Sequence, residues 1–348
     1  MKKLFLMATA ALLVVTFACT NRQQSQNTDK SKEDSVLTLA KAFFKPLPKE
    51  AVNPGNPVTP EKVALGKALY FDNRLSMHNT ESCNTCHNVA TYGVDNNATS
   101  KGDLGKNGNR NSPTTFNAAL HFVQFWDGRM KDVEEQAGGP MMNPVEMNMP
   151  AEKEVVARLS KLDGYKKMFA SAYPDEKNPI TFGNVTKSIA AFERTLLTPS
   201  KFDNYLNGDA TALNDQEKKG LHAFMTTGCT NCHSGPLMGA TMFQKFPLIG
   251  TDYKTLTGSV IDDKGRMEVT KNEADKYVFK VPSLRNAEKT YPYFHDGSVK
   301  ELNKTIVIMA KLQLGRDLTP EQTTDIASFI KTLSSDIPAE VKQAPALP

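Results

Sequence analysis

This sequence of 348 residues has little net charge and no run of basic residues. It has 42 lysines and arginines against 38 aspartates and glutamates, a formal charge of +4, and the basic residues do not gather into one run. A chain that binds nucleic acid concentrates its cations in a patch or a tail. We therefore expect no nucleic-acid partner, and the length allows two domains of ordinary size.

Sustained alternation of apolar and polar residues is also missing, which argues against a fold built mainly from half-buried strands. Helix signals are present instead, such as a capping residue followed by proline. The segments between these signals are long, and long loops are unusual in a compact domain unless something else fills its core. The predicted fold is mainly α with long loops; helices are expected to begin after Thr59, Asn214 and Thr319, and to cover residues 151–172 with a break at Gly164.

The N-terminus has the pattern of an export signal. Lys2 and Lys3 precede an uncharged, mostly apolar stretch over residues 4–18, which is too short for a stable membrane anchor. We interpret residues 1–19 as a signal peptide and the polar residues 20–35 as a flexible tether. Cys19 then is either the lipid-attached cysteine of a lipoprotein or a residue beside an ordinary cleavage site. The expected location is the periplasm or cell envelope.

Cysteine is rare, with 5 residues, and its placement is regular. Apart from Cys19, the cysteines form two C-x-x-C pairs, each followed directly by histidine. In a C-x-x-C-H motif the two thiols attach covalently to the vinyl groups of haem, and the histidine binds the iron. We therefore expect two c-type haems, attached at Cys83 and Cys86 with His87, and at Cys229 and Cys232 with His233.

Three other interpretations of the cysteine pairs explain less. Disulfides form in exported proteins, but they give the histidines no role. Zinc binding would require the two distant pairs to meet and would leave both histidines idle. A thioredoxin-like redox pair needs an α/β fold, which the sequence does not indicate.

Each haem motif follows a similar short segment, Gly66-x-x-x-Tyr70 in the first case and Gly220-x-x-x-Phe224 in the second. We interpret this as two copies of one unit, each wrapped around its own haem. The predicted domains cover residues 36–198 and 199–336, and residues 337–348 are a C-terminal tail.

The sixth iron position of the second haem needs a ligand from a residue after His233. A thioether stabilises ferrous iron, so a histidine and methionine pair suits electron transfer. Met238 and Met242 lie too close to the attachment motif in sequence. The residues by themselves leave Met267 and Met309 open.

The chain resembles the bacterial dihaem cytochrome c peroxidases over residues 35–333. The resemblance implies two cytochrome c-like domains that face each other, and reduction of hydrogen peroxide with electrons from a small one-electron donor protein, a cytochrome c or a cupredoxin. It also implies that electrons enter at the second haem, that peroxide reacts at the first, and that the protein is a homodimer. The motifs that carry it, besides those of the haems, are Leu75-Ser76, Gly93-Val94-Asp95, Arg110–Thr114, Phe125–Arg129, Pro282–Asn286 and Pro292–Gly297.

The resemblance also assigns roles to single residues. Proton transfer between the peroxide oxygens falls to Glu146, with Gln136 as a polar neighbour, and the apolar residues around Glu146 should raise its pKa. Met309 becomes the sixth ligand of the second haem, and Trp126 takes part in electron transfer between the haems. Calcium is expected at the domain interface, held by Asn111, Thr290 and Pro292.

One position departs from the family pattern. Many members carry a histidine in the loop after Asp95 that binds the first haem in the resting enzyme, whereas this sequence has Asp103 there. We therefore expect an open first haem, unless His78 or a methionine of residues 141–149 takes the ligand position.

Two other functions remain to be separated from the peroxidase. A related dihaem enzyme oxidises aromatic side chains of a partner protein, but it has tyrosine where this chain has Met309. A plain electron carrier would leave Glu146 and Gln136 without a role.

Overall fold

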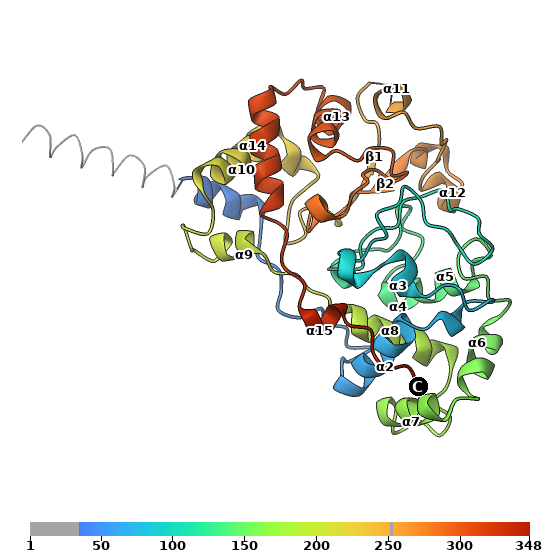
Figure 1. The fold of residues 1–348 in the computed structure, drawn as a ribbon. Coiled ribbons are helices and arrows are strands. Elements are labelled where there is room, and N and C mark those ends of the chain that lie inside the picture. Colours follow the sequence, from blue (N-terminus) through green and yellow to red (C-terminus); the bar gives the residue numbers. More distant parts are fainter. Residues whose placement is uncertain (1–34, 251–252) are drawn as a thin grey trace, which may run out of the picture.

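The computed structural model describes residues 35–250 and 253–348. The predicted signal peptide, Cys19 and nearly all of the predicted tether lie outside this part. The described residues are mainly helical, as predicted, and long irregular segments connect the helices (Figure 1). None of the described helices is long and apolar enough to cross a membrane.

The helices of the first half surround the first C-x-x-C-H motif. Its 3-10 turns are η1 (Asn73–Leu75), η2 (Val89–Thr91) and η3 (Ala118–Leu120). The α-helices are α2 (Pro60–Tyr70), α3 (Cys83–Cys86), α4 (Val133–Gln136), α5 (Gly138–Met142), α6 (Glu152–Leu159), α7 (Asp163–Ala172) and α8 (Phe182–Glu193).

The second half adds a small antiparallel sheet to its helices. Strands β1 (Phe243–Lys245) and β2 (Val278–Lys280) pair with Phe243 opposite Lys280. The 3-10 turns are η4 (Cys229–Asn231), η5 (Glu273–Asp275) and η6 (Ala287–Lys289). The α-helices are α9 (Lys201–Leu206), α10 (Asp215–Thr227), α11 (Tyr253–Thr257), α12 (Met267–Thr270), α13 (Leu302–Leu314), α14 (Pro320–Lys331) and α15 (Ala339–Lys342).

The three predicted helix starts are confirmed by their caps. The Thr59 side chain accepts a hydrogen bond from the backbone N–H of Lys62, and Pro60 follows at the first helical position. Asn214 and Thr319 each form a reciprocal capping box with the residue three positions later.

The predicted helix over residues 151–172 is wrong in the place of its break. The chain leaves the helix at residues 160–162, between α6 and α7, and Gly164 lies inside α7. A Cβ atom at Gly164 would come within 2.3 Å of the Pro348 side chain. Gly164 therefore permits the close approach of the C-terminal segment, a contact that the local sequence does not reveal.

The two halves share one helix-packing arrangement, in which a glycine lets two helices cross closely. In the first half, a Cβ atom at Gly66 of α2 would lie 1.8 Å from the backbone oxygen of Ser188 in α8. In the second, a Cβ atom at Gly220 of α10 would lie 1.8 Å from the backbone oxygen of Asp325 in α14. Since only glycine permits such an approach, the similar segments before the two motifs are confirmed as equivalent in packing.

Each half has its own apolar core, and both ends of the described part of the chain pack against the opposite half. The helix over residues 35–43 packs beside α10 and α14, where Phe44 contacts Phe202 and Phe224. Ile337 joins the core of the first half, and α15 packs against η2 and lies beside α2 (Figure 1). The Arg74 guanidinium donates a hydrogen bond of 2.9 Å to the Pro348 carbonyl. The segment after residue 336 therefore ties the two halves together; the predicted domain boundaries stay predictions.

Candidate haem-binding sites

The first motif sits on the short helix α3, with His87 directly at its end. The Nδ1 atom of His87 lies 2.9 Å from the backbone oxygen of Pro113. Because a carbonyl oxygen only accepts, Nδ1 carries the proton and the Nε2 lone pair stays available for a metal. Burial lowers the pKa of His87, which favours this neutral form.

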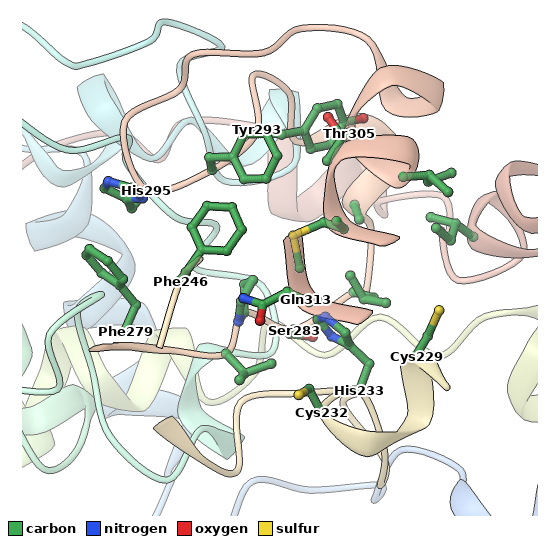
Figure 2. A pocket seen from close by; sticks show the side chains of 18 of the residues that line it. Cys229, Cys232, His233, Phe246, Phe279, Ser283, Tyr293, His295, Thr305 and Gln313 are labelled. Carbon is green, nitrogen blue, oxygen red and sulfur yellow. The ribbon is translucent and has the colours of Figure 1, made fainter. Parts of the chain in front are cut away.

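The second motif repeats this arrangement. Cys229 begins η4, and the Nδ1 atom of the buried His233 lies 3.0 Å from the backbone oxygen of Met238. Burial lowers the pKa of His233 as well. Figure 2 shows Cys229, Cys232 and His233 on one side of a cavity, with Phe246 and Tyr293 across from them.

A separate cavity adjoins each motif. Cys83, Cys86 and His87 line the first cavity, of about 660 Å³, whereas Cys229, Cys232 and His233 line the second. The two pairs thus cannot share one zinc ion, and the four cysteines are free thiols. Within the described ranges, no group of three or more His, Cys, Asp or Glu side chains could hold a metal ion. Two thiols and an imidazole beside a hollow fit a covalently attached haem in each half.

The second cavity distinguishes the two candidate methionines. Met309 lies on α13 and lines this cavity together with Thr305 and Gln313. Met267 begins α12 and lies outside the lining of both cavities. The position of Met309 fits a sixth iron ligand, and that of Met267 does not.

Glu146 and Gln136 line the first cavity together, as the proposed acid and its polar neighbour should. Gln136 ends α4, and Glu146 follows α5 in a turn where Asn143 donates a hydrogen bond of 2.9 Å to its carboxylate. Burial raises the pKa of Glu146, opposed by the Arg129 charge and the Asn143 hydrogen bond. A carboxyl with a raised pKa accepts a proton more readily than an ordinary glutamate and can return it.

Asp103 points away from the first cavity. Its carboxylate accepts hydrogen bonds from the backbone N–H of His78 at 3.0 Å and from the Thr80 hydroxyl at 2.8 Å, and it lies 2.6 Å from His78 Nδ1. Burial of Asp103 acts to raise its pKa, but the hydrogen bonds from His78, Thr80 and Asn148 lower it to about 2. Asp103 therefore holds His78, the alternative ligand, outside the cavity lining.

Trp126 lies between the two cavities and lines both. Its indole N–H donates a hydrogen bond of 2.9 Å to the backbone oxygen of Asn111. Asn111, Thr290 and Pro292, the residues expected to bind calcium, all line the second cavity. All three thus lie at one cavity, Asn111 from the first half of the chain and Thr290 and Pro292 from the second.

A second internal repeat escaped the sequence analysis. Residues 111–130 and 280–299 adopt the same backbone pattern, with left-handed residues at Asn117 and Asn286 and at Phe125 and Phe294. Each copy has a 3-10 turn and an isolated bridge, Gln124 with Met130 and Tyr293 with Val299. The spacing Pro-x-x-x-Asn-Ala, followed by Phe-x-Asp-Gly, was the available signal. Each copy covers one haem motif, since its proline carbonyl faces His87 or His233.

One acidic residue of the first cavity was also missed. Glu193 at the end of α8 is buried and lines the cavity near Cys83. Burial and the neighbouring Glu134 raise its pKa to about 8, against the Arg194 charge. In sequence it is one glutamate among many in helices.

Comparisons with known proteins identify a family with two haems. A family profile described as di-haem cytochrome c peroxidase matches residues 60–211. The cytochrome c551 peroxidase of Pseudomonas aeruginosa is 44% identical over 315 residues, which cover 89% of this chain and 90% of that protein. The cytochrome c551 peroxidase of Nitrosomonas europaea is 44% identical over 296 residues, or 83% and 85% of the two chains.

Relatives with another name match less closely. The methylamine utilization protein MauG of Methylorubrum extorquens is 34% identical over 334 residues, 92% of this chain and 90% of that protein. Among solved structures, a MauG-like protein associated with microbial copper homeostasis superposes with a TM-score of 0.76 at 28% identity, covering 86% of this chain and 97% of that one.

Proposed function

Because this chain belongs to the di-haem cytochrome c peroxidase family, we propose that it reduces hydrogen peroxide to water with electrons from a small one-electron donor protein. The observation that carries the proposal is the difference between the two cavities. The first contains a partly desolvated carboxyl group beside its haem motif, and the second contains a methionine on the helix across from its motif. One cavity is thus equipped for proton chemistry and the other for electron transfer.

The proposed work of the first cavity is proton transfer. Cleavage of peroxide requires that a proton leave one oxygen and reach the other, which departs as water. Glu146 can take the proton in its carboxylate form and return it in its carboxylic acid form. Gln136 can hydrogen-bond to the bound peroxide and orient it, and a haem held by Cys83, Cys86 and His87 supplies the redox-active iron.

The proposed work of the second cavity is to receive electrons one at a time. Peroxide reduction consumes two electrons, while small donor proteins deliver one each, so two redox groups in one chain can hold both. Met309 and His233 would hold the iron of a haem there, and a thioether ligand suits a high potential. Trp126, which lines both cavities, is the proposed route between them.

The second candidate is oxidation of aromatic side chains in a partner protein, since MauG proteins are among the relatives. The resemblance places tyrosine in that enzyme where this chain has Met309. The methionine in the lining of the second cavity therefore favours the peroxidase.

We further propose calcium at Asn111, Thr290 and Pro292, a homodimer, and a periplasmic or envelope location with Cys19 as the site of any lipid anchor. The support for calcium is that the three residues meet at the second cavity from both halves. Metal analysis of the purified protein tests the calcium, and the mass of the protein after export tests the lipid anchor.

Peroxide-dependent oxidation of a reduced cytochrome c tests the main proposal. The unmodified protein should turn over continuously, and Glu146→Gln should be much slower with both haems retained. A protein that exchanges electrons with the donor but ignores peroxide would be an electron carrier, which contradicts the proposal.

A further inference from the structure

Lys280 occupies a position that the second internal repeat makes equivalent to Asn111. The backbone N–H of Lys280 donates a hydrogen bond of 2.7 Å to the Trp126 carbonyl, and that of Asn111 donates one of 2.8 Å to the His295 carbonyl. These two bonds are counterparts, because Trp126 and His295 are equivalent in the two copies. The interface between the halves therefore has an approximate twofold symmetry.

The same alignment of the two copies makes the residues around Lys280 the counterparts of the proposed calcium ligands. His121 and Val123 are the counterparts of Thr290 and Pro292. The ammonium nitrogen of Lys280 lies 3.0 Å from His121 Nδ1 and 3.2 Å from the Val123 carbonyl oxygen. The ammonium group of Lys280 thus occupies the position that the approximate twofold symmetry relates to the proposed calcium ion.

This cation leaves hydrogen-bond donors that need an acceptor. An ammonium group only donates, so His121 Nδ1 accepts and the proton of the neutral ring lies on Nε2. That Nε2 atom is buried and has no hydrogen-bond partner among the described residues. The bonds to His121 and Val123 use two of the three ammonium hydrogens, which leaves the third for another acceptor.

Lys280 and His121 each line both cavities. Lys280 is only 5% exposed, and burial lowers its pKa to about 7, opposed by the Asp127 charge. A buried ammonium group is costly unless an anion pairs with it. Haem carries propionate carboxylates, and the proposed function puts a haem in each of these cavities.

We propose that Lys280 and His121 bind a haem propionate at the junction of the two cavities, so that the ammonium group is a built-in counterpart of the calcium site. The inference rests on the two haems of the proposed function. Neither residue belongs to an attachment motif, so the thioether bonds still hold both haems when either residue is changed. The pair acts on haem potential through its charge, and on haem orientation through its hydrogen bonds.

Redox titration of the holoprotein without peroxide tests this inference, together with the propionate bending bands in its resonance Raman spectrum. Lys280→Met should shift the midpoint potential of at least one haem downward, because a nearby cation stabilises the added electron. The bending band of the same haem should shift too. Lys280→Arg keeps the charge and should stay near the unmodified protein. His121→Phe should shift the same band by a smaller amount. Lys276→Met, which removes a partly exposed lysine from the same segment, is the matched control.

Unchanged potentials and bands in both Lys280→Met and His121→Phe would overturn the inference. If Lys280→Met does not yield folded holoprotein, the His121→Phe band decides by itself. Failure of the proposed function is distinguishable, because it would appear as absent peroxide turnover in the unmodified protein, a measurement that these titrations do not use.

Discussion

At the residue scale, the proposed proton transfer depends first on the carboxyl group of Glu146. Glu146→Gln keeps the size and polarity of the side chain but removes its ability to carry a proton. Turnover should fall by about 10²–10⁴-fold, the usual contribution of general acid–base catalysis. Haem content and reduction by the donor should be unchanged. Glu152→Gln, an exposed glutamate at the start of α6, is the control and should keep full activity.

The pH dependence of turnover tests the same group independently. Glu146 accepts a proton only when it is deprotonated, and burial raises its pKa. Activity should therefore decline as the pH falls through this raised pKa, at a higher pH than an ordinary glutamate would give. An acidic limb that persists unchanged in Glu146→Gln would assign the titration to another group.

A second residue-scale prediction concerns the sixth ligand of the second haem. Met309→His should lower the midpoint potential of that haem, because imidazole stabilises ferrous iron less than a thioether does. It should also abolish any charge-transfer band between thioether and iron. Met267→Leu is the control and should leave both features as they are; the opposite pattern would identify Met267 as the ligand.

At the scale of the elements, two glycines decide how closely the helices cross. Gly66→Ala would place a methyl group against the Ser188 carbonyl, so α2 and α8 must move apart. We expect a loss of about 1–3 kcal/mol in the free energy of unfolding, measured by denaturant titration. A Cβ atom at Gly183, also in the first half, would meet only the Thr181 hydroxyl oxygen at 4.0 Å, so Gly183→Ala should be neutral or stabilising by up to about 1 kcal/mol. Equal stability in both variants would contradict the crossing.

We expect the loop over residues 99–108 to set the resting state of the first haem. Its Asp103 backbone N–H donates a hydrogen bond of 2.7 Å to the Glu146 carbonyl, and its carboxylate holds His78 outside the cavity. No imidazole from this loop can therefore cap the iron. Electron paramagnetic resonance of the oxidised protein should show a high-spin signal beside one low-spin signal. Two low-spin signals, with peroxide reactivity only after half-reduction, would show that another side chain occupies the position.

Local sequence predicts those features of the elements that depend on neighbouring residues. The helix starts at Thr59, Asn214 and Thr319 could be predicted because a cap is formed by the capping residue and the few residues after it. The break between α6 and α7 was misplaced, because Gly164 makes room for the distant Pro348 and does not end a helix. The repeat of residues 111–130 and 280–299 escaped notice because its shared residues form two short motifs with differing residues between them, and their common backbone pattern is what makes them one unit.

At the scale of the molecule, the two halves are joined at their equivalent elements. The side-chain amides of Asn117 and Asn286 both donate to the Thr198 hydroxyl, at 2.7 and 2.8 Å. Thr198 lies at the boundary that the sequence predicted between the domains. The sequence could indicate two units, but not the crossing of both chain ends or the shared hydroxyl, since these contacts join residues far apart in the chain.

Two attachment motifs in one chain require two haems. A pyridine haemochrome assay should give about two haems c per chain, and both should stay with the protein on a denaturing gel. Variants that replace both cysteines of one motif should keep one haem. Zinc or disulfides at these cysteines in the mature protein would contradict the account.

The number of electrons consumed per peroxide distinguishes a peroxidase from an electron carrier. Reduced cytochrome c is mixed with catalytic amounts of the protein, and known amounts of hydrogen peroxide are added in the absence of oxygen. The account predicts that two donor molecules are oxidised for each peroxide, over many turnovers. If oxidation of the donor stops once the protein's own haems are reduced, whatever the amount of peroxide, the proposed peroxidase function is contradicted.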